Sequence, residues 1–448
     1  MARKQLHLAA HFPGVNNTTV WSDPRSRSQI EFSSFRDLAR TAEEGTFDFF
    51  FLAEGLRLRE VHGQIHDLDV VGRPESITVL TALAAVTTHL GLAATVNATF
   101  NEPYELARRF ASLDHLSGGR AAWNVVTSSD AFTGENFRRG GFLDHADRYT
   151  RASEFVSAAR TLWDSWTDDD LIADRRSGRF AAEGAGRFSH RGQHFDIAGE
   201  FTVPRSPQGH PVVIQAGDSA DGRDFAAAQA DVIFTRHGTL EAGQAFYADV
   251  KSRLAAHGRT PDSLKIMPGV SVVVGDTDAE AEEKAAHIRS QQVSGATAIA
   301  TAELLWGIDL SDRDPDGPLP LQDPVVGSGV VRGRVGFTDP VATVAQWREA
   351  AESHGWSLRQ TVIAQQNRQS FIGSADTIAR QLDSYVQADA ADGYILVPHL
   401  TPGGLDDFVA KVVPLLRERG VFRSEYTGRT LRDHLQLPTP QGAASGAA

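Results

Sequence analysis

The chain has 448 residues, contains no cysteine and carries a formal net charge of −13 at pH 7. This length allows one large domain or two to three ordinary ones. The absence of cysteine excludes disulfides, thiolate metal sites and a cysteine nucleophile, and the negative charge argues against nucleic acid as the main partner. No apolar stretch is long enough to span a membrane and no signal-peptide pattern is visible, so we expect a cytoplasmic protein without a membrane partner.

Eight short apolar segments predict strands that are buried on both faces. They cover residues 5–12, 47–54, 90–97, 121–128, 211–216, 231–236, 264–274 and 393–398. Stretches with helical spacing or helix-start signals follow most of them, at 34–44, 74–86, 102–116, 144–166, 219–229, 240–256, 279–290, 340–354, 375–388 and 405–419. Such strands alternating with helices are typical of a parallel sheet, and eight units favour an α/β fold of the closed (β/α)8 TIM barrel type.

An open doubly wound sheet is the alternative fold, and it needs a nucleotide fingerprint at its switch point. The nearest approach, residues 327–333, has the wrong glycine spacing and follows no good strand. We interpret residues 1–437 as a single barrel domain with insertions at about 167–209, carrying a hairpin near 187–201, and at about 294–370.

Within the second insertion, residues 294–339 are rich in loop-forming residues. We expect the part from about 312 to 337 to be a mobile cover over the barrel mouth, because long irregular loops in compact domains are usually lids or disorder. The tail 438–448 is expected to be disordered.

One strand–turn–helix corner has the composition of a phosphate site. The apolar segment 211–216 leads through Gly217 to Ser219, which stands at the N-cap position of the next helix. Glycine lets the turn pass close to a ligand, and the helix start directs backbone N–H groups and the positive end of its dipole at one point. An ordinary capped corner that binds nothing is the structural alternative.

Polar residues stand at the C-terminal ends of the predicted strands, where the function of a barrel collects. They are His11, Glu54, Asn97, Thr127, Ser128, the turn of Gly217, Asp218 and Ser219, and His237. The set is rich in hydroxyls and amides and poor in metal ligands, so we expect no metal site. It suits a polar cofactor that brings its own reactivity, although a cap, an ion pair or a solvated loop explains each member separately.

Four segments carry a family resemblance: 113–120 (LDHLSGGR), 123–128 (WNVVTS), 145–149 (HADRY) and 214–219 (IQAGDS). Together they resemble the nitrilotriacetate monooxygenase family, the flavin-dependent relatives of bacterial luciferase that include dibenzothiophene-sulfone, long-chain alkane and streptogramin-oxidising monooxygenases. The C-terminal segments 406–414 and 430–432 also fit this family.

The resemblance implies an FMNH2-dependent monooxygenase on a luciferase-like barrel, the oxygenase component of a two-component system. A separate NAD(P)H:flavin reductase would supply the reduced FMN, and O2 would be the co-substrate. One oxygen atom would enter a small organic substrate, such as an amine, a sulfur compound or a natural product, through a flavin C4a-hydroperoxide. Homodimers or homotetramers are expected from the same resemblance.

The resemblance also assigns the cofactor-binding residues. By position, Ser128, Tyr149 and the turn Ala216 to Ser219 match the family's phosphate binders. His145 lies one helical turn before Tyr149 and shares its face.

The resemblance assigns the residues beside the flavin ring and the catalytic candidates to the ends of other strands. Glu54 stands where the family has an acid beside the isoalloxazine ring, and Asn97 and Thr127 end strands that face the same ring. Glu54, His11 and His237 are the catalytic candidates, His11 being at a place where relatives often have phenylalanine. Some relatives have a histidine near residues 304–307, but this chain has leucine and tryptophan there, so that acid–base role is not carried over.

Three other functions remain open at this stage. A deazaflavin-dependent oxidoreductase or a non-catalytic flavin-binding protein could use the same barrel. A glycosidase built on Glu54 and Asp218 would require two carboxyl groups at a hydrolytic separation.

Overall fold

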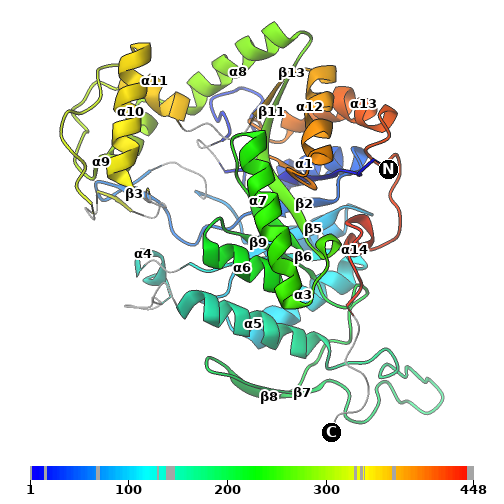
Figure 1. Ribbon diagram of the computed structural model, residues 1–448. Helices are drawn as coiled ribbons and strands as arrows, with labels where there is room; N and C mark the ends of the chain where they lie inside the picture. The colour runs from blue at the N-terminus through cyan, green and yellow to red at the C-terminus, as the bar shows by residue number, and fades with distance from the viewer. Residues whose placement is uncertain are drawn as a thin grey trace.

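The computed structural model describes residues 3–14, 18–66, 71–128, 131–137, 147–326, 330–332, 337, 339–365 and 370–440. Its centre is a closed barrel of eight parallel strands, which confirms the predicted TIM barrel (Figure 1). The strands are β1 (His7–His11), β2 (Phe49–Leu52), β5 (Gly91–Asn97), β6 (Ala121–Val126), β9 (Val212–Ala216), β10 (Val232–Thr235), β11 (Lys265–Gly275) and β14 (Gly393–Leu396). They follow one another around the barrel in chain order, and β14 pairs with both β11 and β1 to close it.

Alternate residues of the barrel strands face inward, as the pleat requires. The inward side chains form one apolar core, which includes Ala9, Phe51, Ile214 and Met267. The outward side chains join a second, larger core with the surrounding helices. Both faces of the strands are therefore buried, which is why the strands are continuous apolar runs in the sequence.

Helices surround the barrel between successive strands. They are α1 (Phe32–Glu44), α2 (Ser76–Ala84), α3 (Pro103–Ser117), α5 (Asp147–Trp163), α6 (Ala220–Gln229), α7 (Leu240–Arg253), α8 (Asp278–Gln292), α12 (Ala375–Gln387) and α13 (Val413–Glu418). Short 3-10 helices lie at Leu254–His257, Pro261–Ser263 and Gly403–Leu405, and a π-helical turn at Phe408–Val412 precedes α13. The proline and glycine that predicted the two ends of α3 lie where expected. Pro103 is in its first turn, and the helix ends at Gly118, which has a left-handed φ of 71°. No helix among the described residues combines the length and the apolar character needed to cross a membrane.

The first insertion contains the predicted hairpin, formed by β7 (Arg187–Arg191) and β8 (Asp196–Glu200). Figure 1 shows it projecting below α5. The carboxylate of Glu154 on α5 accepts the backbone N–H groups of the hairpin turn, including that of Phe195 at 2.7 Å. This charged contact fixes the hairpin to the barrel wall.

The second insertion is more ordered than the sequence indicated. It forms α9 (Gly295–Trp306), α10 (Pro340–His354) and α11 (Leu358–Gln365) around an apolar core of their own, and these helices lie to one side of the barrel (Figure 1). The expectation that 294–339 is loop-rich is therefore wrong for α9. Eight of its twelve residues are buried, and a helix buried on most sides lacks the polar face that reveals helical spacing. An unpredicted strand, β13 (Ser370–Ser374), pairs with the end of β11.

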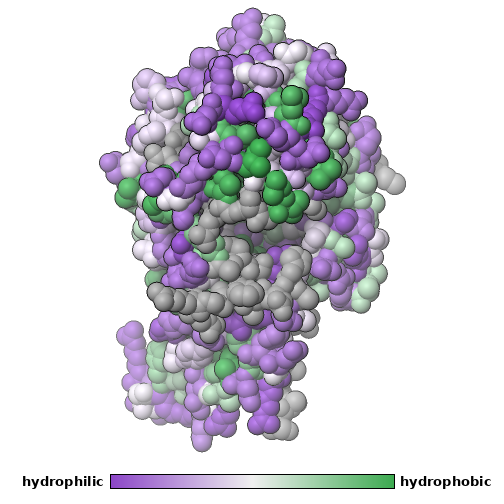
Figure 2. Space-filling view, turned by 90° about the vertical axis from the view of Figure 1, so that its left-hand side faces the viewer, coloured by the Kyte–Doolittle hydropathy of each residue, from purple (hydrophilic) through white to green (hydrophobic). Residues whose placement is uncertain are grey.

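A small three-stranded sheet joins two loops of the barrel mouth. Its strands are β3 (Glu60–Val61), β4 (Gln64–Ile65) and β12 (Val331–Arg332), and β12 pairs with β3. Part of the expected cover, 312–337, is therefore paired with the loop after β2. Residues 327–329 and 333–336 lie outside the described residues. Apolar side chains gather on the face that carries α9 to α11 (Figure 2), and Leu321, Val325 and Val326 are among the exposed ones.

The C-terminal segment closes the N-terminal end of the barrel. Leu431 in α14 (Leu431–His434), Leu435 and Leu437 enter the inward apolar core, and Arg432 reaches Asp231 at 2.9 Å. The first three residues of the expected disordered tail, 438–440, are among the described residues. The carbonyl of Pro440 accepts a hydrogen bond from Arg205 at 2.8 Å. Residues 441–448 lie outside the described residues.

Candidate functional site

Two parts of the chain, the start of α5 and the turn before α6, converge where α6 begins. Ser219 is the N-cap of α6, and its hydroxyl accepts the backbone N–H of Gly222 at 3.1 Å. A Cβ placed on Gly222 would lie 3.1 Å from the Ser219 hydroxyl, 3.2 Å from the Tyr149 hydroxyl and 3.3 Å from the carbonyl carbon of Gly217. Two hydroxyls and the backbone turn therefore meet at a helix N-terminus, which is the arrangement that anions favour. The sequence predicted Ser219 and Tyr149, but not Gly222.

The Gly217 turn is shaped by its own strand. A side chain on Gly217 would place its Cβ 2.5 Å from the Nε2 atom of Gln215. Gln215 is buried, and its Oε1 atom has no hydrogen-bond partner in the described part of the chain. A side chain at 217 would therefore force the end of the Gln215 side chain to shift. Asp218 in the same turn accepts the hydroxyl of Thr235 at 2.8 Å, which ties the turn to β10.

Two buried amides inside the barrel have unused hydrogen-bonding atoms. Asn97, the last residue of β5, accepts the N–H groups of Thr99 and Phe100 at 2.6 and 3.2 Å, while its Nδ2 atom is buried without a partner among the described residues. Asn124 on β6 donates to Thr95 at 3.0 Å, and its Oδ1 atom is likewise unsatisfied. Buried polar atoms are usually paired, and these two lie on the inward face of the barrel, so they are available to a polar ligand there. Asn97 was predicted; Asn124, which faces inward two residues after Ala122, was not.

Glu54 lies two residues beyond the end of β2 and is half-buried. Burial raises the pKa of its carboxyl to about 7, and the neighbouring charge of Glu75 adds to the effect. Glu75 is held in place because it caps α2, accepting the N–H groups of Ile77 and Thr78 at 2.9 and 2.7 Å. This cap also makes the helix begin at Ser76, two residues later than expected from Pro74. Glu54 can thus carry a proton near neutral pH.

The two candidate histidines point in different directions. His11 ends β1 on the inward side, with its ring centroid 5.2 Å from that of Phe51. His237 follows β10, and its ring lies 5.6 Å from Phe246 and beside Gly243, both on α7. Burial lowers the pKa of His237, against the opposing charge of Asp218. His11 is therefore placed toward the barrel interior, whereas His237 packs against the outer helix layer.

The remaining predicted residues are less constrained. Thr127 and Ser128 are half-buried directly after β6, and their roles stay predictions. His145 lies outside the described residues.

Comparison with known proteins decides the family. Residues 14–392 match the model of the family described as luciferase-like monooxygenase. The chain belongs to the luciferase-like monooxygenase family. It is 39% identical over 445 residues to N-acetyl-S-(2-succino)cysteine monooxygenase of Bacillus subtilis (strain 168), covering 98% of both chains. It is 40% identical over 460 residues to nitrilotriacetate monooxygenase component A of Aminobacter aminovorans, covering 99% of both.

A solved structure shows the same relationship. The crystal structure of riboflavin lyase, with modified FMN and riboflavin, has a TM-score of 0.79 and 30% identity and covers 97% of both chains. With full-length monooxygenase relatives at this level of identity, the protein is a flavin-dependent monooxygenase.

The residues at the mouth of this luciferase-like barrel fit a flavin. The cradle around Gly222 offers two hydroxyls and a helix N-terminus to a phosphate group. The unused amide atoms of Asn97 and Asn124 offer one donor and one acceptor, and a flavin ring presents both types of atom. Arg148, whose guanidinium lies 4.9 Å from the Tyr149 ring, adds positive charge beside the cradle and was not predicted.

Glu54→Gln is expected to lower turnover with reduced FMN about tenfold, since that factor corresponds to the free energy of about one hydrogen bond. The folded protein is expected to be at least as stable as the parent at neutral to alkaline pH. The folded-state pKa of Glu54 is raised from 4.5 to about 7. Its ionisation therefore penalises the folded state as the pH rises through this range, and glutamine removes the penalty. Steady-state turnover and thermal midpoints, with Glu44→Gln as the exposed control, test this. Normal turnover with a lowered midpoint would assign Glu54 a structural role.

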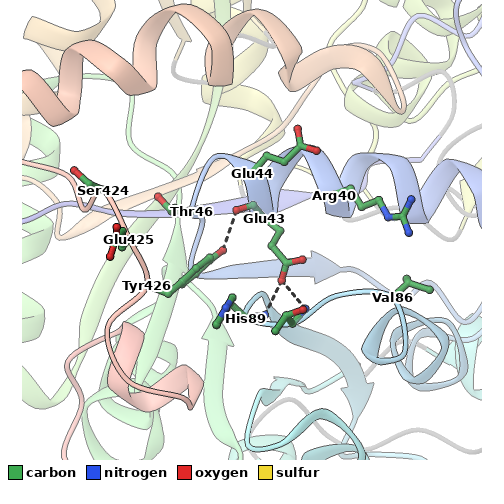
Figure 3. Close-up of a pocket in the computed structure, with 10 residues that line it drawn as sticks. Arg40, Glu43, Glu44, Thr46, Val86, His89, Ser424, Glu425 and Tyr426 are labelled. Carbon is green, nitrogen blue, oxygen red and sulfur yellow. Dashed lines mark hydrogen bonds between the residues drawn. The ribbon is translucent and has the colours of Figure 1, made fainter.

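A groove at the opposite end of the barrel is a different kind of feature (Figure 3). It is lined by Arg40, Glu43, Glu44, Thr46, Val86, Thr88, His89, Ser424, Glu425 and Tyr426. Its central groups already bind one another: Glu43 accepts the N–H groups of Thr88 and His89 at 2.8 and 2.6 Å, and Tyr426 donates to the Phe47 carbonyl at 2.7 Å. Polar groups at this end of a barrel serve stability, so we place the functional site at the mouth.

Proposed function

We propose that this monooxygenase is the oxygenase component of a two-component system and receives reduced FMN from a separate NAD(P)H:flavin reductase. The observation that carries the proposal is the cradle around Gly222, where Tyr149, Ser219 and the Gly217 turn meet at the start of α6. Such a cradle suits a flavin that carries a phosphate. The relative from Aminobacter aminovorans is named as component A of its enzyme, which supports a second component.

In this proposal each part of the mouth has one task. The α6 cradle and Ser128 hold the phosphate, and Asn97 and Asn124 orient the ring through their unused amide atoms. Glu54 holds or moves a proton beside the ring, and the sheet of β3, β4 and β12 limits access of water. When bound, reduced FMN would supply two of the four electrons that reduce O2 and the substrate would supply the other two, with one oxygen atom entering the substrate and the other leaving as water.

We propose a carboxylated thioether or amine as the substrate class. Two relatives near 40% identity are named for N-acetyl-S-(2-succino)cysteine and for nitrilotriacetate. Both compounds combine carboxylates with an oxidisable sulfur or nitrogen position. Oxygen consumption with reduced FMN across a panel that starts from these compounds tests the proposal, with a reduced deazaflavin as the control. Oxidation of the reduced deazaflavin by a substrate, without oxygen consumption, would favour the oxidoreductase alternative.

The purified chain is expected to show no NADH oxidation above background when FMN is added without a reductase. The reason is that the chain has no dinucleotide fingerprint after any strand. Absorbance of NADH under air measures this, and adding an NADH:flavin reductase should start rapid consumption. Rapid consumption by the chain alone would contradict the two-component proposal. Light scattering on the same preparation would test the expected homodimer or homotetramer.

A further inference from the structure

One imidazole and two carboxylates come together beside the barrel mouth, apart from the candidate flavin residues. His62 occupies the turn between β3 and β4, Glu303 lies in the last turn of α9, and Asp309 follows that helix. The Nε2 atom of His62 lies 2.7 Å from Glu303 Oε1 and 3.5 Å from Asp309 Oδ1. The three potential ligand atoms lie within 4.8 Å of one another.

The two carboxylates of this cluster differ: Asp309 is exposed and its Oδ1 atom accepts the N–H and the hydroxyl of Ser311, whereas Glu303 is buried and incompletely compensated. Glu303 is 1% exposed, and its Oε2 atom has no hydrogen-bond partner within the described ranges. Its Oε1 atom accepts the N–H of Leu310 at 2.9 Å in addition to the His62 contact. Among the described residues, neither carboxylate pairs with a lysine or an arginine. A buried carboxylate without full compensation is costly, so the cluster has capacity for a further positive charge.

We propose that His62, Glu303 and Asp309 form a site for a divalent transition-metal cation, and that Zn2+ is the ion their one nitrogen and two oxygen donors suit best. Zinc binds three protein ligands plus water at about 2.0–2.2 Å in tetrahedral geometry, which separates neighbouring ligands by about 3.4 Å. The 3.5 Å between His62 and Asp309 matches this spacing. The 2.7 Å between His62 and Glu303 is a hydrogen-bond distance, so a metal there would replace the shared proton and the two side chains would have to separate to about 3.4 Å.

This site differs from the sequence-based expectation of no metal, because its ligands come from segments far apart in the chain. A cation there would tie α9 to the sheet of β3, β4 and β12. The N–H of His62 already donates to the Val330 carbonyl at 3.1 Å, directly before β12. The metal would thus fasten part of the mouth cover, and the proposal does not depend on the flavin assignment.

Calorimetric titration of the full chain, first treated with a chelator and dialysed, tests the site with ZnSO4. One equivalent of zinc is expected to bind, and His62→Ala and Asp309→Asn are each expected to weaken its affinity at least tenfold. Asp309→Asn keeps the acceptor for the N–H of Ser311, which now lies at 2.9 Å. Asp314→Asn is the matched control, since Asp314 accepts the N–H of Asp316 at 2.9 Å in the same type of turn.

The variants are necessary because the chain has 16 histidines, and those other than His62 can bind zinc elsewhere. Loss of the tight equivalent in both site variants, with the Asp314→Asn protein unchanged, supports the proposal. Absence of tight zinc binding, or equal affinity in the His62→Ala protein, overturns it. MgCl2 at the same concentration is expected to give no comparable binding, and an equal response to magnesium would also overturn the assignment to a transition metal.

Discussion

Replacing Tyr149 by phenylalanine and Ser219 by alanine in one chain is expected to weaken the binding of reduced FMN about 100-fold. A hydrogen bond to a charged group is worth about 1.5–3 kcal/mol, and about 1.4 kcal/mol corresponds to a factor of ten in affinity. If the free energies of two such bonds added, the loss of affinity would exceed a factor of 100. We expect about 100-fold because the contributions of neighbouring groups are not additive and the backbone N–H groups of α6 still bind the phosphate. Anaerobic titration with reduced FMN measures the effect.

The control for this experiment must separate loss of a helix cap from loss of a ligand contact. Ser374 caps α12 with φ −63° and ψ 160° and accepts a backbone N–H, and Ser219 caps α6 with φ −68° and ψ 160°. Ser374→Ala should therefore cost similar cap stability while leaving reduced FMN affinity unchanged. If the Tyr149 and Ser219 variant binds reduced FMN as tightly as the parent, the phosphate lies elsewhere and the cradle is only a structural corner.

The barrel was predictable because its strands are buried on both faces and separated by helical segments. Every one of the eight predicted strands overlaps an observed one, from 5–12 over β1 to 393–398 over β14. The helix α9 was missed because burial on most sides removes the polar stripe. β13 was missed because, in the described part of the chain, its five residues pair with the end of β11 alone, a contact that no local pattern encodes.

The parts of the candidate site that could be predicted are those formed by a single stretch of the sequence. The N-cap at Ser219 follows from local capping chemistry. The role of Gly222 in the cradle depends on the hydroxyl of Tyr149, which lies on a helix more than 70 positions earlier in the chain. No local pattern could predict that contact. His237 lies two residues beyond the end of β10, where the alternation of the strand no longer sets the side-chain direction, so its contact with α7 could not be predicted from the sequence.

Asp48→Asn is expected to reduce the free energy of unfolding by about 3–5 kcal/mol, the usual cost of breaking a buried ion pair by removing one charge. Asp48 is fully buried and sits between the first two strands. It accepts the N–H of Leu8 at 2.8 Å, lies 3.1 Å from Nδ1 of His7, and pairs with Arg423. Asparagine keeps the acceptor for Leu8 but leaves the Arg423 guanidinium, which is largely buried, without its counter-charge. Urea unfolding at neutral pH measures the loss.

The pH dependence gives this prediction a second test. Burial alone would raise the pKa of Asp48, but Arg423 and His7 outweigh it and lower the value from 3.8 to about 2. A carboxyl with a depressed pKa stabilises the fold fully above its unfolded value and loses that contribution as the pH falls toward the folded one. The stability difference between the parent and Asp48→Asn should therefore be constant above about pH 5 and shrink on acidification toward pH 2.

Asp37→Asn is the matched control for Asp48→Asn, because Asp37 pairs with Arg27 and Arg36 but has a side chain that is 32% exposed. Solvent screens such pairs, so its loss should cost no more than about 1 kcal/mol. Equal destabilisation by the two changes would mean that burial does not strengthen the Asp48 pair. A difference between the parent and Asp48→Asn that persists unchanged to acid pH would show that packing, and not the charge of Asp48, joins the C-terminal segment at Arg423 to the first strands of the barrel.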